Sequence, residues 1–341
     1  MMMQKKQRGL SLVEVLVSLV ISLFLLGGVV QVYIANKTTY RFTDSISRIQ
    51  ENGRFAMESV VQDLRLAGFW GCATFDPDDT ENITNNLDPA SPAYDPLLHD
   101  FGGQSAIQGT ENDGLNGSDS LTLRGAKPNQ VNVHPPYNVT TSDNINVTAT
   151  NSIEAGDIVM VSNCQGVDIF QVTGITSPVA DQNGIVHVTG SGAPGNHNPG
   201  ACAGGPAVHC LSQTYGSDAA LFAMQTVTYT IAAGASGEPA LWREENGANI
   251  ELIEGVEEMQ LLYGIDDDGD GYANQYVDSV AVADMNDVIA VRLMLLLRSE
   301  NDFITEDAQT YTLNGNTVTP NDRRMRLVFA TTIGLRNRIG K

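Results

Sequence analysis

The sequence predicts an α+β protein in which one long N-terminal helix packs on a mostly antiparallel β-sheet with long loops. Two observations lead to this prediction. An apolar stretch from Leu10 to Asn36 continues into an amphipathic pattern that reaches Gly68. Beyond it, short runs of apolar and β-branched residues alternate with turns rich in Gly, Pro, Asn and Asp, which is typical of hairpin-connected strands.

The N-terminal segment joins a basic leader to an apolar span. Lys5, Lys6 and Arg8 precede the stretch Leu10–Asn36, in which Glu14 is the only ionisable side chain. At about 1.5 Å of rise per residue, a helix of this length crosses a hydrocarbon core of about 30 Å. Because basic residues stay on the cytoplasmic side, we expect a single-pass inner-membrane protein with a cytoplasmic N-terminus and a periplasmic body.

Gly9 is the one small residue at a plausible cleavage position, and it precedes the apolar span instead of following it. Cleavage after Gly9 would therefore retain the helix. A carboxylate such as Glu14 costs roughly 2.5–3.5 kcal/mol inside a membrane span, so we expect it to have a partner or a function. An uncleaved signal anchor would explain the basic leader and the apolar span, but not Glu14.

The run from Gly9 to Glu14, GLSLVE, resembles the type IV prepilin cleavage motif. The resemblance implies that a prepilin peptidase cuts between Gly9 and Leu10 and methylates the new amine of Leu10. Most members have Phe where this chain has Leu10. In a water-poor filament core, the Leu10 amine of one subunit would pair with the Glu14 carboxylate of another, so that each charge offsets the desolvation of the other.

The second half of the helix, residues 37–68, is expected to lie in the periplasm and to pack on the globular body, because its apolar residues recur at spacings of three and four. Gly27-Gly28 and Gly53 are positions where this helix could bend. The apolar residues are Phe42, Ile46, Ile49, Phe55, Met57, Val60, Val61, Leu64 and Leu66.

The remainder, residues 69–341, is expected to form a β-rich head, after a leader (1–9), a membrane and filament-core helix (10–36) and its periplasmic half (37–68). A proline-punctuated stretch from Cys72 to about Gly117 has no helical period and predicts a long surface region. The predicted strands are Ser120–Arg124, Asn144–Thr148, Asp157–Ser162, Asp168–Ile175, Gly184–Thr189, Ala223–Ile231, Ala240–Arg243, Met259–Gly264, Val288–Leu297 and Met325–Ile333.

The charge balance and the motifs limit the classes of function that this chain can have. Asp and Glu number 40 against 19 Lys and Arg, which gives a formal charge of −21. Such a chain repels phosphate backbones, so we expect no nucleic-acid partner, while divalent cations are favoured. The sequence contains no GxSxG, HExxH, P-loop or dinucleotide fingerprint. We therefore expect a protein that is not an enzyme.

The cysteines are even in number, lack CxxC spacing and all follow the apolar span, so a periplasmic body predicts disulfides. Among the three pairings that four cysteines allow, we prefer Cys202–Cys210, which closes a local loop, with Cys72–Cys164, which ties the helix end to the sheet. A zinc site built from Cys202, His209 and Cys210 is the weaker alternative, because the histidines lack metal-ligand spacing.

An acidic run, DDDGDGY, places carboxylates at positions 1, 3 and 5 of a DxDxDG loop, which converges hard oxygens on one cation. The flanking residues are strand-like, and position 12 is Val277 instead of Glu, so we expect a calcium loop on a hairpin and not an EF-hand. A solvated acidic turn is the alternative. The proposed ligands are Asp266, Asp268, Asp270, the carbonyl of Tyr272 and Asn274, directly or through water.

Segments at both ends are similar to PilW-type minor pilins. The resemblance implies a pilin-like fold in a minor pilin that helps prime or assemble type IV pili. It also implies other minor pilins, the major pilin and a pilus tip protein as partners, a final place in the pilus at the cell surface, and support of adhesion or twitching motility. The similar segments are Gly53–Met57, Gly68–Cys72, Glu254–Gln260, Tyr263–Asp266 and Phe329–Arg338.

Two alternatives remain open. A minor pseudopilin of a type II secretion system shares the N-terminal motif, although the PilW-like segments and the Arg-rich C-terminus favour the pilus. An uncleaved, membrane-anchored periplasmic module that binds its target in a calcium-dependent way would keep its leader, so cleavage at Gly9 distinguishes it.

Overall fold

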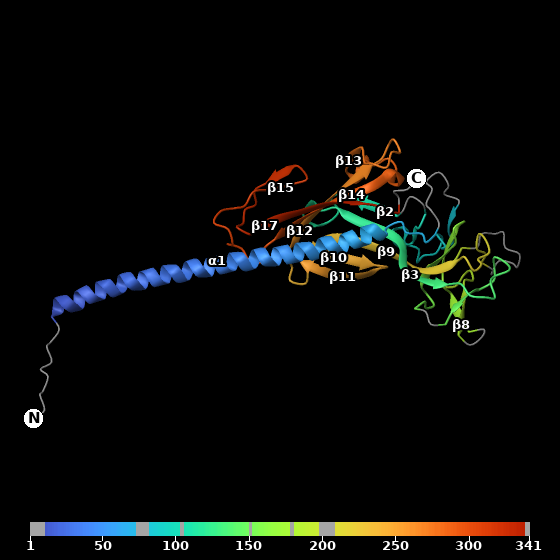
Figure 1. Cartoon of the computed structure of the whole chain (residues 1–341), viewed down its shortest axis with the longest axis horizontal. Coiled ribbons are helices and arrows are strands. Elements are labelled where there is room, and N and C mark those ends of the chain that lie inside the picture. Colours follow the sequence, from blue (N-terminus) through green and yellow to red (C-terminus); the bar gives the residue numbers. More distant parts are fainter. Residues whose placement is uncertain are drawn as a thin grey trace, which may run out of the picture.

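The computed structural model describes residues 11–72, 82–102, 106–149, 152–177, 181–197 and 209–337. One long helix, α1 (Leu12–Leu66), projects from a β-rich head, and its C-terminal part lies along the head (Figure 1). The helix ends at Leu66, two residues before the predicted Gly68, and the Gly68 N–H donates to the carbonyl of Arg124 at 2.9 Å. The predicted α+β class, with a long apolar N-terminal helix and mostly antiparallel sheets, is confirmed.

The two halves of α1 have different surroundings. The large apolar residues from Leu12 to Ile34 are exposed, whereas Ile49, Gly53, Ala56, Val60 and Leu64 are buried against the head. This spacing of three and four residues aligns one face of the helix with the core.

Three features of α1 differ from the prediction. Phe55 is exposed because it does not lie on the face of the helix that meets the core. Phe42 does lie on that face, two turns before Ile49, but it is exposed because burial against the head begins only near Ile49. Gly53 lies inside the continuous helix α1 and does not interrupt it. The ring of Phe329 occupies the space in which a Cβ atom of residue 53 would stand. Gly53 therefore permits close packing between helix and sheet.

The larger sheet has the order β1-β6-β5-β9-β10-β11, with β3 on the other side of β9 and β2 paired with β3. All its pairs are antiparallel except β1 with β6. Its strands are β1 (Ile83–Asn85), β2 (Ile107–Thr110), β3 (Ser120–Asn132), β5 (Ile158–Ser162), β6 (Val167–Gln171), β9 (Ala220–Ala233), β10 (Pro239–Glu245) and β11 (Ala248–Glu254).

The second sheet has the antiparallel order β13-β12-β14-β17. Its central strand β14 is apolar on both faces, because α1 packs on one face and the β15–β16 hairpin covers part of the other. The strands are β12 (Val256–Ile265), β13 (Gln275–Val277), β14 (Val288–Arg298) and β17 (Arg326–Gly334), and the hairpin is β15 (Tyr311–Leu313) with β16 (Asn316–Val318).

Smaller elements complete the head. A three-stranded sheet of order β4-β8-β7 lies at the end of the head far from the N-terminus of α1 (Figure 1). The strands are β4 (Ile145–Thr148), β7 (Gly174–Thr176) and β8 (Gln182–Val186), and the short helices are α2 (Pro96–His99), η3 (Leu115–Gly117), η4 (Ser279–Ala281) and η5 (Met285–Asp287).

Each predicted strand overlaps an observed one, with two informative differences. The run Asp168–Ile175 divides into β6 and β7, which pair with different sheets. The strand at Ser120 continues through Pro128 to Asn132, because the register shifts between Ala126 and Gln130 and the missing proline N–H falls in that irregularity. The short strands β1, β2, β13, β15 and β16, and the polar strand β11, escaped prediction.

The expected surface region from Cys72 to about Gly117 is exposed or half-buried at most of its described residues, but parts of it enter the core. Leu87, Phe101 and Ile107 are fully buried there, and β1 pairs with β6 while β2 pairs with β3. These segments complete the core, because single apolar residues between prolines fill gaps without producing a helical or strand period.

Candidate functional site

The N-terminus of α1 is stabilised by a capping box. The Ser11 hydroxyl accepts a hydrogen bond from the Glu14 N–H at 3.2 Å, and the Glu14 carboxylate accepts one from the Ser11 N–H at 3.1 Å. The pair satisfies two N–H groups that a helix end leaves without intrahelical partners. Gly9 and Leu10, the predicted cleavage site, lie outside the described residues.

The first half of α1 is long and apolar enough to span a membrane, with a mean hydropathy of 2.5 over its best window and none of that window buried. No described part of the head covers it, as Figure 1 shows. Such a surface needs lipid or neighbouring helices around it.

The second half of α1 is joined to the head by a polar cluster. Asp63 accepts hydrogen bonds from the Tyr229 hydroxyl at 2.6 Å and from Arg243 Nε at 2.9 Å, and Arg243 also donates to Glu245 at 2.6 Å. Burial, and then the Asp63 charge, raise the pKa of Tyr229. Burial lowers the pKa of Arg243, but its hydrogen bonds to Glu245 and Asp63 outweigh this effect and leave the pKa raised.

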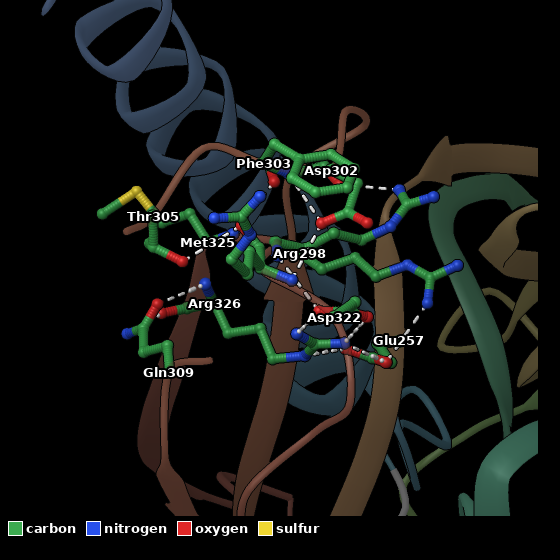
Figure 2. Close-up of polar contacts among 12 residues, drawn as sticks. Glu257, Arg298, Asp302, Phe303, Thr305, Gln309, Asp322, Met325 and Arg326 are labelled. Atoms are coloured by element: carbon green, nitrogen blue, oxygen red, sulfur yellow. Dashed lines mark hydrogen bonds and ion pairs between the residues drawn. The ribbon is translucent and has the colours of Figure 1, made fainter. Parts of the chain in front are cut away.

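A second charged cluster fixes the start of β17 (Figure 2). Arg326 is almost fully buried, and its guanidinium contacts Glu257 at 2.6 Å and Asp322 at 2.6 Å. Arg298 joins the same Glu257 at 3.2 Å. The hydrogen bonds from Arg326 hold the pKa of Asp322 at about 2. This network links β12, β14 and β17 at one edge of the head.

Beside this network, a groove of about 770 Å³ separates α1 from the base of the head. Its walls include Arg48 and Asn52 of α1, Glu238, Glu300 and Arg324. Acidic and basic side chains both line it, and Arg48 bridges Asp44 on its own helix at 3.1 Å. This pair is exposed, so it contributes little to stability.

The acidic loop lies on a hairpin, as the sequence predicted, because β12 pairs with β13 from Tyr263↔Val277 to Ile265↔Gln275. Carboxylate oxygens of Asp266, Asp268 and Asp270 all lie within 4.8 Å of one another, a spacing at which one metal ion could be held.

Backbone N–H groups organise this loop around Asp266. Desolvation raises the pKa of the Asp266 carboxyl, but hydrogen bonds from Gly271 at 2.9 Å and Gly269 at 2.7 Å outweigh it and hold the pKa below its usual value. The Asn274 side-chain oxygen accepts from the Asp267 N–H at 3.0 Å. The Tyr272 N–H donates to Asp270 at 2.8 Å. The structure thus gathers the three aspartates, while the roles of Tyr272 and Asn274 as ligands stay predictions.

A disulfide joins the segment that follows α1 to the head. Cys72 and Cys164 form a disulfide with Cα atoms 4.8 Å apart, which is the pairing preferred from the sequence and ties the segment after α1 to the β5–β6 turn. Cys210 is also disulfide-bonded, and Cys202 lies outside the described residues. Because a disulfide sulfur is not a thiolate ligand, this bond of Cys210 contradicts the weaker zinc alternative built from Cys202, His209 and Cys210.

A buried histidine pair was missed by the sequence analysis. His187 Nδ1 lies 2.9 Å from His209 Nδ1, and His187 Nε2 lies 3.0 Å from the Asp143 carbonyl. Since that carbonyl only accepts, His187 Nε2 carries a proton and its Nδ1 accepts from His209. Burial, and then His187, lower the pKa of His209 to about 3. The two residues are 22 positions apart, so no spacing rule could have paired them.

The exposed apolar half-helix, the amphipathic half clamped to a β-rich head and the helix-end disulfide together define a membrane-anchored filament subunit of the pilin type. Comparison with family models agrees at both ends of the chain. Residues 4–30 match the prokaryotic N-terminal methylation motif, and residues 228–337 match the type IV pilus-assembly protein W family. Comparisons with curated proteins and with solved structures found no match.

The two family matches support a PilW-like type IV pilin. The pilin is anchored in the inner membrane by α1 with its head in the periplasm, and it later enters the pilus. The match to family W runs from within β9 to just beyond β17, so it covers the second sheet, the acidic hairpin and the Arg326 cluster.

Proposed function

We propose that this pilin is a structural minor subunit that helps prime or assemble type IV pili, takes part in a tip complex and thereby supports adhesion or twitching motility. The observation that carries the proposal is the construction of α1. Its first half exposes a mostly apolar surface, and its second half is fixed to the head through Asp63 and the core residues. A subunit built in this way can leave the bilayer and enter a bundle of similar helices without changing its own fold.

The match to the W family favours the pilus over a type II secretion pseudopilin, because it covers the second sheet and its hairpin, whereas the N-terminal motif is common to both systems. The proposed partners are prepilin peptidase, other minor pilins, the major pilin and a pilus tip protein. The proposed role is structural and not enzymatic.

We also propose calcium as the ion for the acidic hairpin. Three carboxylates converge, and hard oxygens in this spacing suit calcium. The loop projects from the second sheet away from the apolar half of α1 (Figure 1). A bound ion there would neutralise the repulsion among the carboxylates and stiffen a surface that neighbouring subunits can reach.

Processing of the N-terminus tests the proposal directly. The terminus of the membrane-extracted protein would be measured by mass spectrometry in cells with and without prepilin peptidase, alongside its content in sheared pili. We expect a peptidase-dependent N-methyl group on Leu10 and protein in the sheared fraction. An intact leader ending at Gly9 in both strains would refute the filament role and favour the uncleaved periplasmic module.

A further inference from the structure

The free edge of the second sheet lies on β17, and its outward groups can be identified from the ladder. Ser299 donates from its N–H to Met325 at 2.8 Å, and Leu335 donates to Ile289 at 2.8 Å. The register between β14 and β17 is continuous between these two bonds. In an antiparallel pair, hydrogen-bonded residues alternate along each strand. The backbone N–H and C=O groups of the odd-numbered residues of β17 therefore bond to β14, and those of the even-numbered residues point outward from the sheet edge.

The outward backbone groups of Arg326, the first residue of β17, already have hydrogen-bond partners. Gln309 donates to the carbonyl of Arg326 at 2.9 Å and accepts from its N–H at 2.9 Å, as Figure 2 shows. This side chain takes the place of a neighbouring strand. After it, Val328, Ala330 and Thr332 have no backbone hydrogen-bond partner on their outward side within the described part of the chain. Val328 is 39% exposed.

The β17 edge lacks the features by which proteins protect edge strands. Residues 327–334, LVFATTIG, contain no charge and no proline, and the register carries no bulge. The long edge strand β11 of the other sheet is different. It carries Glu251 and Glu254, and a register shift interrupts its pairing with β10. Among the described strands, the edges β1, β2 and β13 have at most four residues each.

The direction of β17 limits what can pair with it. Phe329 packs on Gly53, and the Asn337 side chain donates to the Ala67 carbonyl at 3.0 Å, so β17 runs in the same direction as α1. Two copies of β17 paired antiparallel would hold their α1 helices in opposite directions. One membrane cannot accept both, because each N-terminus must face the cytoplasm. An antiparallel addition, which continues the order of this sheet, therefore requires a strand other than a second β17.

We propose that the β17 edge from Val328 to Thr332 binds an extended, uncharged strand of a different pilin subunit by β-strand addition. This inference rests on the proposed function, since it names how this pilin contacts a neighbour. The strand would extend the second sheet beside the half of α1 that packs on the head. Backbone hydrogen bonds would supply affinity, and the small side chains of Ala330 and Thr332 would admit a close neighbour.

The test uses the full-length protein in its own cells, with a photoreactive amino acid in place of Val328. After irradiation of whole cells, cross-linked peptides would be mapped by mass spectrometry. Ala330→Pro removes an outward N–H without touching the bonds to β14, and Ala330→Ser is the matched control that keeps this N–H. We expect cross-links to a strand of another pilin, reduced about tenfold by the proline and unchanged by the serine.

Equal cross-linking in the proline and serine variants would overturn the inference, as would cross-links that reach no pilin. Cross-links to a second copy of this chain would show that the assigned occupant is wrong. The thermal unfolding of each variant in detergent reports folding. Should Ala330→Pro fail to fold, Thr332→Pro removes the next outward N–H instead. Leader cleavage and pilus content of the wild-type protein are measured separately, so failure of the proposed function is distinguishable from failure of the edge contact.

Discussion

The carboxylate of Asp63 on α1 lies 2.9 Å from Arg243 Nε on β10, across 180 residues of sequence. The same carboxylate accepts from the Tyr229 hydroxyl of β9 at 2.6 Å. Both Asp63 and Arg243 are largely buried, with side-chain exposures of 13% and 17%. This contact fixes the rotation of the membrane helix relative to the head, because a helix turned about its axis would separate all three groups.

Asp63→Ala is expected to destabilise the folded head by about 2 kcal/mol, since it leaves Arg243 Nε buried without an acceptor and leaves the Tyr229 hydroxyl only the Ser59 carbonyl, 3.1 Å away. Thermal unfolding of the full chain in detergent measures the effect. Asp44→Ala is the matched control on the same helix. Its pair with Arg48 is exposed, and its removal should cost less than about 1 kcal/mol. Equal losses in the two variants would show that Asp63 does not anchor the helix.

Glu14 can be tested with two substitutions that separate its charge from its helix-capping role. Glu14→Gln keeps a side chain able to accept from the Ser11 N–H but removes the charge, whereas Glu14→Ala removes both. Pairing with the Leu10 amine of a neighbour requires the charge. We therefore expect both variants to be cleaved and inserted yet scarce in sheared pili, measured by immunoblot. Normal incorporation of the Gln variant would refute the charge pairing.

The acidic hairpin is expected to bind calcium and to raise the melting temperature of the protein when the ion is added. Asp268→Ala is the sharpest variant, because it removes a ligand oxygen while the backbone N–H groups at the centre of the loop bond mainly to Asp266. Its melting temperature should no longer respond to calcium or EGTA. Asp267→Asn removes the same charge from the loop outside the triad and should preserve the response. A wild-type melting temperature that ignores calcium would exclude the site.

Because the pKa of buried His209 is lowered, we expect the folded head to lose stability in mild acid. Its pKa in the folded head is about 3, well below the usual value near 6.5, because the ring is buried next to His187. The unfolded chain therefore binds a proton between these values while the folded chain does not. The contribution of neutral His209 to the free energy of unfolding is therefore fully present above about pH 6.5. Below this pH it is lost, by up to about 1.4 kcal/mol per pH unit.

The measurement is the difference in melting temperature between pH 7 and pH 5. His209→Asn cannot gain this proton, so it should show a smaller difference than the wild-type protein, although the substitution itself lowers stability at both values. Carboxylates titrate in the same range in both proteins, and the comparison removes their contribution. An unchanged pH difference in the variant would mean that another group is responsible.

Local sequence patterns predicted the elements that depend on neighbouring residues. The apolar span, its amphipathic continuation to about Gly68 and the strands flanking the acidic loop all follow from spacing within one segment. The disulfide between Cys72 and Cys164 was preferred from its place after the helix, although spacing alone permitted other pairings. Exposure of Phe55 was not predicted, because a helix with apolar residues on several sides does not reveal which side meets the head. Exposure of Phe42 was not predicted, because the spacing does not reveal where along the helix the head begins.

The sequence by itself determined the membrane helix, its orientation and the chemistry of the hairpin, because lipid thickness, charge and ligand spacing act within a few tens of residues. Only the tertiary structure decided that Asp63 meets Arg243, that His187 meets His209 and that β17 is the edge of its sheet. These relationships depend on which distant strands pair. Many pairings satisfy the same alternating pattern, and packing of the whole core selects one of them.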